Sequence, residues 1–196
     1  VELLSNRNLE HPAILDSRVC ECCQTSAAMT ARGPVVVYRD RSEDEVRDIV
    51  INGPAKIARV IHADNWNIAG CPVNGPMLAT FNNELAIAWY TSPNNTPTVN
   101  VSFSVNEGIS FKAPIKVNVS QPIGRVDLLW LNKNEVIVSW IESSETTTNI
   151  LSRIVSKNGE MLESRIISEI EPGRVSGYPQ MEIVDDQLFF AWTESG

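Results

Sequence analysis

The sequence predicts an all-β fold: a partial β-propeller of about four blades, each built from a four-stranded antiparallel sheet. Three observations predict it: apolar runs that end in an aromatic residue, a constant spacing of these runs, and turn signals between short β-branched segments. The aromatic residues are Tyr38, Trp89, Trp140 and Trp192, at spacings of 51, 51 and 52 residues. A fixed period near 50 residues is typical of repeated supersecondary units.

Each repeat unit has the content of one propeller blade. The apolar segments are short and β-branched, and turn signals such as Asn82-Asn83 and Asn158-Gly159 separate them, whereas a helical repeat would show a 3.6-residue period. In the second unit we expect strands over residues 75–80, 84–91, 98–104 and 113–119. Four strands per unit indicate a blade.

The 196 residues are expected to form one β-propeller domain that is truncated at both ends. Its units span approximately residues 20–68, 69–120, 121–171 and 172–196, and residues 1–19 form the end of a preceding blade. Unpaired strand edges invite pairing with another chain. We therefore expect self-association through the edges at residues 1–5 and 188–194.

The composition restricts the partners. Hydrophobic residues make up 43% and charged residues 20% of the chain, as in ordinary globular proteins, and the formal net charge is −8. This charge repels phosphate backbones and anionic lipid surfaces, and no apolar stretch is long enough to span a bilayer. We expect no nucleic-acid partner and no membrane span, but rather a glycan or another small polar ligand.

One hairpin loop and several longer segments resemble a known family. Ser104 to Phe111 is similar to the Asp-box (BNR repeat) of sialidase-like propellers, with Asn106 in place of the aspartate. Residues 18–25, 37–42, 68–76 and 124–127 resemble bacterial exported exo-sialidase-like proteins of undefined activity. The resemblance implies a sialidase-like fold and a periplasmic or extracellular location.

The cysteines form a second group of candidate residues. Counting back from the repeat aromatics places Cys71 and the segment Cys20 to Cys23 before the innermost strands of adjacent blades, so we expect them to lie close together. Three alternatives remain open: two disulfides, or one disulfide with two buried thiols, that join neighbouring blades; free buried thiols; or a zinc or copper(I) site. The residues of this disulfide or metal site are Cys20, Cys22, Cys23, Cys71 and His62.

A sialidase-type glycoside hydrolase needs an arginine cluster for the substrate carboxylate, a tyrosine nucleophile assisted by a glutamate, and an acid. The Arg-Ile-Pro sequence of true sialidases is absent, and the closest match is Arg125-Val126-Asp127. Salt bridges and solvated loop rims are therefore the favoured explanation of these charges. The candidate catalytic residues are Tyr178, Glu194, Asp40 and Asp127.

We expect binding rather than catalysis. Residues 39–48 carry eight charges of mixed sign and join two strands, which suits recognition of a polar ligand such as a carbohydrate, and Tyr38 and Trp66 offer rings for stacking on a sugar. A sialidase-type hydrolase is the alternative, and a metal-binding exported propeller is the second alternative. The candidate ligand-binding residues are Tyr38, Arg39, Arg41, Asn74, Arg125 and Arg174.

Overall fold

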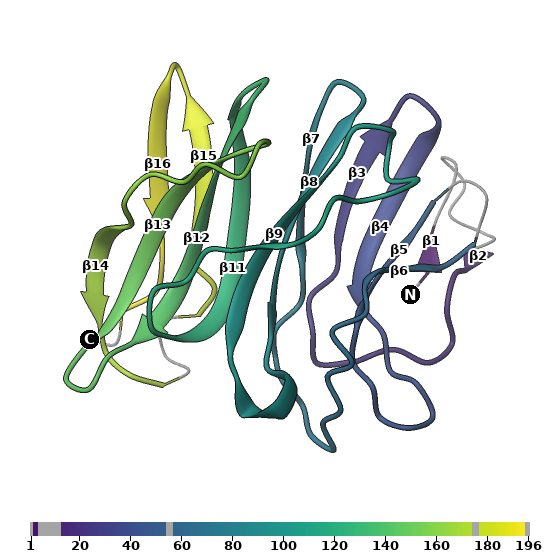
Figure 1. Ribbon diagram of the computed structural model, residues 1–196, viewed down its shortest axis with the longest axis horizontal. Coiled ribbons are helices and arrows are strands. Elements are labelled where there is room, and N and C mark those ends of the chain that lie inside the picture. The colour runs from purple at the N-terminus through teal and green to yellow at the C-terminus, as the bar shows by residue number, and fades with distance from the viewer. Residues whose placement is uncertain (1, 4–12, 54–56, 174–176, 195–196) are drawn as a thin grey trace.

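The computed structural model describes residues 2–3, 13–53, 57–173 and 177–194, and these residues form antiparallel β-sheets (Figure 1). Three sheets have four strands and two have two strands. Within the described ranges the one helical element is the 3-10 turn Pro93–Asn95. The prediction of an all-β partial propeller is therefore confirmed.

The sheets follow one another along the chain. The first blade contains β3 (Ser26–Thr30), β4 (Gly33–Arg39), β5 (Ile49–Asn52) and β6 (Arg59–His62). The second contains β7 (Met77–Phe81), β8 (Glu84–Thr91), β9 (Thr98–Ser104) and β10 (Ile115–Lys116). The third contains β11 (Gln121–Asn132), β12 (Glu135–Ser143), β13 (Thr148–Ser156) and β14 (Arg165–Ile170), and β15 (Gln180–Val184) pairs with β16 (Gln187–Ala191).

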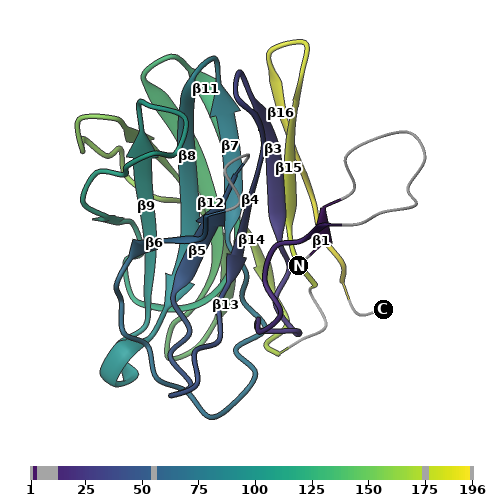
Figure 2. The same ribbon diagram turned by 90° about the vertical axis from the view of Figure 1, so that its right-hand side faces the viewer.

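The blades stand side by side with their first strands facing a common side. The inner strand β7 contacts β3 and β11, and β11 contacts β15. In the turned view, β3 and β15 lie on one side of the molecule and β6 and β9 lie on the other (Figure 2). The loops that precede the inner strands, and those that join second to third strands, meet at the lower end in Figure 1. We call this end the loop face.

The repeat aromatics occupy equivalent places. Each lies five residues after the first residue of its second strand: Tyr38 in β4, Trp89 in β8, Trp140 in β12, and Trp192 directly after β16. Tyr38, Trp89 and Trp140 are fully buried. A constant position in a strand gives a constant side-chain direction, because successive residues point to opposite faces of a sheet.

Successive side chains of β8 enter two different cores, which explains why the apolar runs are continuous. Ile87 and Trp89 belong to a core shared with the first blade, whereas Ala86 and Ala88 belong to a core shared with the third blade. A strand covered on both faces has to be apolar at every position. The large side chains fill one interface and the small ones fit the other, which sets the spacing of the blades.

Each repeat aromatic also donates a hydrogen bond from its polar tip to a carboxylate, as buried Trp and Tyr side chains usually require a partner. The pairs are Tyr38 Oη with Asp16 Oδ2 (2.9 Å), Trp89 Nε1 with Asp64 Oδ2 (2.7 Å), Trp140 Nε1 with Glu142 Oε2 (2.7 Å) and Trp192 Nε1 with Glu194 Oε1 (2.9 Å).

Polar side chains of one blade grip the backbone of the next. Gln24 Oε1 accepts from Gly75 N at 2.8 Å, and Ser26 Oγ accepts from Leu78 N at 3.1 Å. Such bonds satisfy peptide groups that the sheet ladder leaves over. We call the side chains that act in this way at the inner strands the docking clamps: Gln24, Ser26, Asn74, Arg125 and Asp127.

The hairpin loop after β9 closes on itself. Ser104 Oγ accepts from Gly108 N at 2.9 Å, and Asn106 Oδ1 accepts from Ser110 N at 3.0 Å. An amide oxygen accepts these bonds as a carboxylate oxygen would. Gly108 has φ +79°, and an added Cβ would lie 2.7 Å from Ile51 Cδ1 of the first blade.

We predict that Gly108→Ala destabilises the protein by about 1–3 kcal/mol more than Gly159→Ala does. Both glycines have a positive φ, but nothing lies within 4 Å of a Cβ added at Gly159. The difference therefore isolates overpacking between the first two blades from backbone strain. Urea unfolding of the two variants measures it, and equal midpoints would contradict the prediction.

The short strand β1 (Glu2–Leu3) pairs with β2 (Ala13–Ile14). The other residues of the expected edge at 1–5 lie outside the described ranges. Self-association stays a prediction, which light scattering of the purified chain can check. Among the described residues, no helix has the length and apolarity that crossing a membrane requires.

Candidate functional site

Two adjoining clefts lie on the loop face. The first has a volume of about 620 Å³ and the second about 450 Å³. Each lies between neighbouring blades and is bounded by the chain that leads into β7. Loops held by a rigid sheet scaffold are the usual place of binding residues.

The first cleft is polar and bordered by a disulfide, and we call it the charged cleft. It lies between the first blade and the segment before β7. Its lining residues are Glu21, Cys22, Arg41, Glu45, Arg47, Ala69, Gly70 and Cys71.

Glu45 organises the cations of the charged cleft. Its carboxylate accepts from Arg41 Nε at 3.0 and 3.2 Å and from Arg47 at 2.6 Å. The hydrogen bond from Arg41, followed by the one from Arg47, lowers the pKa of Glu45. The other end of the Arg41 guanidinium lies 3.7 Å from Glu21, whose side chain is 79% exposed. Two cations and two carboxylates thus balance among the lining residues, and Arg18, outside the lining, lies 3.6 Å from Glu45.

The second cleft has an aromatic wall and we call it the aromatic cleft. The rings of Trp66 and Tyr90 meet edge to face at 5.6 Å between centroids. Trp66 is itself buried and lies 5.0 Å from the Arg39 guanidinium carbon. The described residues that line it are Trp66, Ile68, Pro72, Val73, Asn74, Tyr90, Pro122, Ile123, Arg125 and Gly173.

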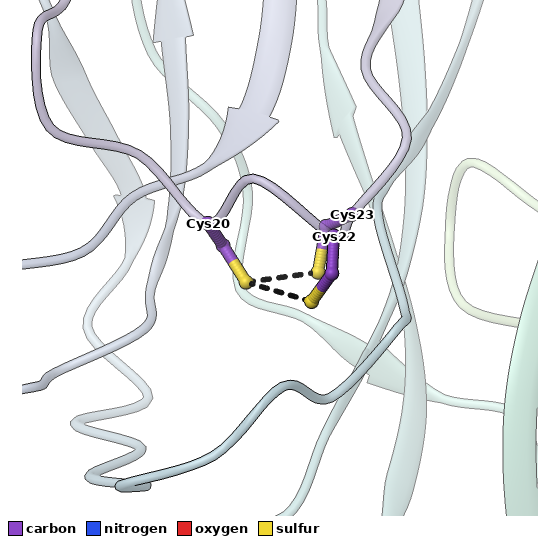
Figure 3. Close-up of side chains that lie close together, drawn as sticks. All are labelled: Cys20, Cys22 and Cys23. Atoms are coloured by element: carbon purple, nitrogen blue, oxygen red, sulfur yellow. Dashed lines mark hydrogen bonds between the residues drawn. The ribbon is translucent and has the colours of Figure 1, made fainter.

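Cys71 lies against the segment Cys20 to Cys23, as the alignment of the units predicts. A disulfide joins Cys22 to Cys71 with a Cα–Cα distance of 6.2 Å, while Cys20 and Cys23 are buried free thiols. The Cys20 sulfur lies 3.2 Å from the Cys23 sulfur and 3.6 Å from the Cys22 sulfur (Figure 3). One bond between blades with two thiols beside it is one of the alternatives left open by the sequence.

Burial is the main reason why the pKa of the Cys23 thiol is raised to about 11, and its hydrogen bond to Cys20 acts in the same direction. Cys23 is therefore protonated near neutral pH. His62 lies in β6 and its Nε2 is 3.8 Å from Asp64. Of the described residues, the metal-binding types whose ligand atoms come together are the three cysteines Cys20, Cys22 and Cys23, without His62.

Arg39 does not reach a ligand site. Its side chain donates from Nε to Asn74 O at 2.7 Å, from NH1 to Arg47 O at 2.6 Å and from NH2 to Tyr90 O, and the residue is 1% exposed. A guanidinium whose three nitrogens all bind backbone carbonyls joins the blades. This corrects the expected ligand-binding role of Arg39.

Tyr38 is likewise part of the core, because its ring is 1% exposed and its hydroxyl donates to Asp16. The expectation that its ring stacks on a sugar is therefore wrong. Asp40 follows β4, and its backbone N donates to Asp48 O at 2.9 Å. Burial raises the pKa of the Asp40 carboxyl. Its role as an acid stays a prediction.

Asn74 and Arg125 line the aromatic cleft, but their polar groups grip the following blade. Asn74 donates to Ile123 O at 2.9 Å and accepts from Arg125 N at 2.7 Å. The Arg125 guanidinium donates to Gly177 O at 2.8 Å and to Gly173 O at 3.0 Å. Both candidates for ligand binding therefore act as docking clamps.

Tyr178 and Glu194 each have a partner in the fold. Tyr178 Oη donates to Val73 O, two blades away in the chain, and Glu194 accepts from Trp192. Glu194 stands two residues after its aromatic, as Glu142 stands two residues after Trp140. Their catalytic pairing stays a prediction. Arg174 lies outside the described residues.

Asp127 is buried and accepts from Met181 N and from its neighbour Leu128 N. Burial is the largest cause that raises its pKa. The folded state then holds the proton more tightly than the unfolded state, so the free energy of unfolding falls as the pH rises from about 4 through the raised pKa. This is the usual sign for a desolvated carboxyl.

We predict that Asp127→Asn flattens this fall, because the amide keeps an acceptor oxygen and does not titrate. Urea unfolding of both proteins between about pH 4 and pH 7 measures the slope. Burial also raises the pKa values of Asp48 and Asp64, so in the variant the free energy of unfolding should still fall with pH, but less steeply. An unchanged slope would exclude Asp127 as a source.

Comparisons with known proteins stop at the fold. No family model matches the chain, and no curated protein matches it. The chain resembles a solved Bombyx mori GH32 beta-fructofuranosidase, BmSUC1, with 14% identity over 85% of this chain and 39% of that chain and a TM-score of 0.44. For a mutant of BmSUC1 in complex with sucrose, the identity is 13% over 87% and 42% of the two chains and the TM-score is 0.43. The chain spans about two fifths of their length, and a likeness this low says nothing about activity.

The sequence reasoning named Arg41 but missed Glu21, Glu45 and Arg47 as lining residues of the charged cleft. Two of them lie in the charged stretch 39–48, so its mixed charges were the available signal. Glu21 is the neighbour of Cys22. Because Cys22 was expected to lie close to Cys71, the same reasoning would have placed Glu21 in this cleft.

Proposed function

We propose that this propeller binds a polar, uncharged ligand of the carbohydrate class in the charged cleft. The observation that carries the proposal is a volume of about 620 Å³ on the loop face that is lined by two arginines and two glutamates. Sugar hydroxyls both donate and accept hydrogen bonds. A wall that offers guanidinium donors beside carboxylate acceptors matches that chemistry.

Arg41 is the residue that we expect to bind the ligand. Its side chain is 34% exposed, and two contacts with Glu45 hold its guanidinium in place. The remaining partner, Glu21, is exposed at 3.7 Å, and such surface ion pairs contribute about 0–1 kcal/mol. A ligand hydroxyl can therefore replace this contact at little cost.

The balance of charge disfavours an anionic sugar. A carboxylate ligand needs accessible, uncompensated cations, but Glu45 contacts Arg18, Arg41 and Arg47, and the guanidiniums of Arg39 and Arg125 are buried and donate to backbone carbonyls. This also argues against the sialidase-type hydrolase, whose substrate carboxylate requires an arginine cluster. Binding is therefore preferred to turnover.

Saturation-transfer NMR with matched neutral and sialylated oligosaccharides tests the proposal. We predict signal from neutral sugars and an affinity about tenfold lower in Arg41→Ala, the loss of one hydrogen bond to a charged group. The control is Arg32→Ala, because Arg32 also pairs with a glutamate, Glu107 at 3.5 Å, but lies in the β3–β4 turn at the opposite end of the blade.

Two results would contradict the proposal: an affinity equally reduced by both arginine substitutions, or no signal from any sugar. A fluorogenic sialoside separates the hydrolase alternative, since turnover that is lost in Tyr178→Phe would support catalysis. We expect no turnover.

A further inference from the structure

Four cysteine sulfurs gather where the first two blades meet. Cys20, Cys22 and Cys23 have their sulfur atoms within 4.8 Å of one another (Figure 3). Cys71 is bonded to Cys22. Zinc–thiolate bonds of about 2.3 Å in a tetrahedron place the sulfurs about 3.8 Å apart. The separations from Cys20, 3.2 and 3.6 Å, are close to that spacing.

Backbone bonds hold this arrangement independently of the disulfide. Cys23 N donates to Cys20 O at 3.1 Å, which closes a turn and brings the two thiols to the same side. Cys20 N donates to Arg39 O at 3.0 Å, which ties the turn to the end of β4. Cys20, Cys22 and Cys23 are therefore positioned together whether or not Cys22 is oxidised.

Two buried cations adjoin the sulfurs. Arg47 NH1 lies 3.1 Å from the Cys20 sulfur while its NH2 pairs with Glu45 at 2.6 Å, and Arg39 is buried with its guanidinium on backbone carbonyls. Four thiolates around a divalent ion carry an excess of two negative charges. Donors and charges just outside the ligands stabilise and orient thiolates. These polar surroundings therefore suit a metal-bound thiolate cluster better than neutral, apolar surroundings would.

The disulfide is the part of the cluster that solvent reaches. Cys22 and Cys71 line the charged cleft, and Cys71 is exposed, whereas Cys20 and Cys23 are buried. A dithiol reductant in the cleft can attack the disulfide and transfer two electrons and two protons. It leaves as its own disulfide and yields the thiols of Cys22 and Cys71.

We propose that reduction of Cys22–Cys71 creates a binding site for a thiophilic d10 metal ion at Cys20, Cys22 and Cys23, with Cys71 as the fourth sulfur. Binding of the ion releases the thiol protons to solvent. Zinc would use all four sulfurs, whereas copper(I) is satisfied by fewer soft ligands. This inference does not rest on the proposed sugar binding.

The test compares the same chain in two states. The protein is reduced under nitrogen with a phosphine that binds metals weakly, or left oxidised, and titrated with cobalt(II) as a spectroscopic substitute for zinc. We expect about one equivalent bound by the reduced chain, with thiolate-to-cobalt charge-transfer bands that zinc abolishes, and at least tenfold weaker binding by the oxidised chain.

A second arm titrates the reduced chain with copper(I) held by a competing chelator. Uptake of about one equivalent without a cobalt signal identifies copper(I) as the ion and still supports the site. If the reduced chain takes up neither ion, or the oxidised chain binds both equally well, the proposal is overturned.

Two variants assign the ligands. Cys20→Ser removes a sulfur central to the cluster and should abolish the cobalt bands. Since Cys20 is buried, near-UV circular dichroism has to confirm its fold. Cys71→Ser changes an exposed position, so it should fold, keep three sulfurs and bind cobalt at least tenfold more weakly while retaining copper(I). Unchanged cobalt binding in Cys71→Ser, or in a folded Cys20→Ser, would contradict the assignment.

Discussion

Replacing Arg39 with methionine should lower the free energy of unfolding by about 3–5 kcal/mol. Methionine occupies much of the same volume, so packing changes little. The loss comes from three backbone carbonyls, those of Asn74, Arg47 and Tyr90, that are left without their donor. Because these carbonyls belong to both the first and the second blade, the variant also loosens the contact between blades.

Denaturant unfolding of Arg39→Met beside Arg41→Met measures the effect. Arg41 is two residues away and partly exposed, and its ion pairs at the surface contribute about 0–1 kcal/mol. A loss below about 1 kcal/mol in Arg39→Met would show that water replaces the guanidinium and that the region is less dry than the structure indicates.

The Cys71→Ser variant should be less stable than the wild-type protein by about 2–4 kcal/mol. The disulfide closes a loop with a sequence separation of 49 residues, and cross-linking a loop of that size restricts the unfolded chain. The bond also joins two blades, so its loss weakens the contact between them. Thermal unfolding with a chelator present keeps metal from compensating.

Reductant provides the matched control for this variant. It should lower the melting temperature of the wild-type protein to that of Cys71→Ser and leave the variant unchanged. If the wild-type melting temperature does not respond to reductant, the disulfide is either absent in solution or without effect on stability, and the prediction fails.

The repeat was the part of the fold that the sequence predicted best. Each aromatic falls on the same position of its strand because the pleat has a period of two residues and a turn of two residues precedes the second strand of each blade. In the second unit the strands expected over 84–91 and 98–104 are β8 and β9 as observed. The last strand is shorter than expected, Ile115–Lys116, because beyond Lys116 the Val99 N–H donates to the Asn118 side chain at 3.0 Å instead of to the opposite backbone.

The candidate site was less predictable, as two neighbouring arginines show. Arg39 and Arg41 lie two residues apart and would share a face if the strand continued, but β4 ends at Arg39. Arg39 therefore turns into the blade interface and Arg41 into the charged cleft. Nothing in the residue types separates the two, since both are cations in a charged stretch. The contacts of the neighbouring blade decide which one is buried.

The arrangement of the cysteines was less predictable than the repeat and more predictable than the burial of the two arginines. The unit length predicted that Cys71 would lie near Cys20, Cys22 and Cys23, because one repeat brings equivalent loops of adjacent blades together. It could not choose the partner. That choice depends on the turn from Cys20 to Cys23, which points Cys20 and Cys23 inward and Cys22 toward the cleft.

The docking clamps have a consequence for how far the blades can diverge. The hydrogen bonds of each clamp go from a side chain of one blade to peptide groups of the next, so the receiving strand can exchange side chains without losing these bonds. Close approaches restrict it: a Cβ at Gly75 would lie 1.9 Å from Gln24 O, and a Cβ at Gly124 would lie 2.3 Å from Asn74 Oδ1. Substitutions should therefore be tolerated unequally: exchanges among apolar side chains along a receiving strand keep these bonds, whereas changes at the few clamp positions lose them. This asymmetry accounts for blades that share a shape and a period while sharing few residues.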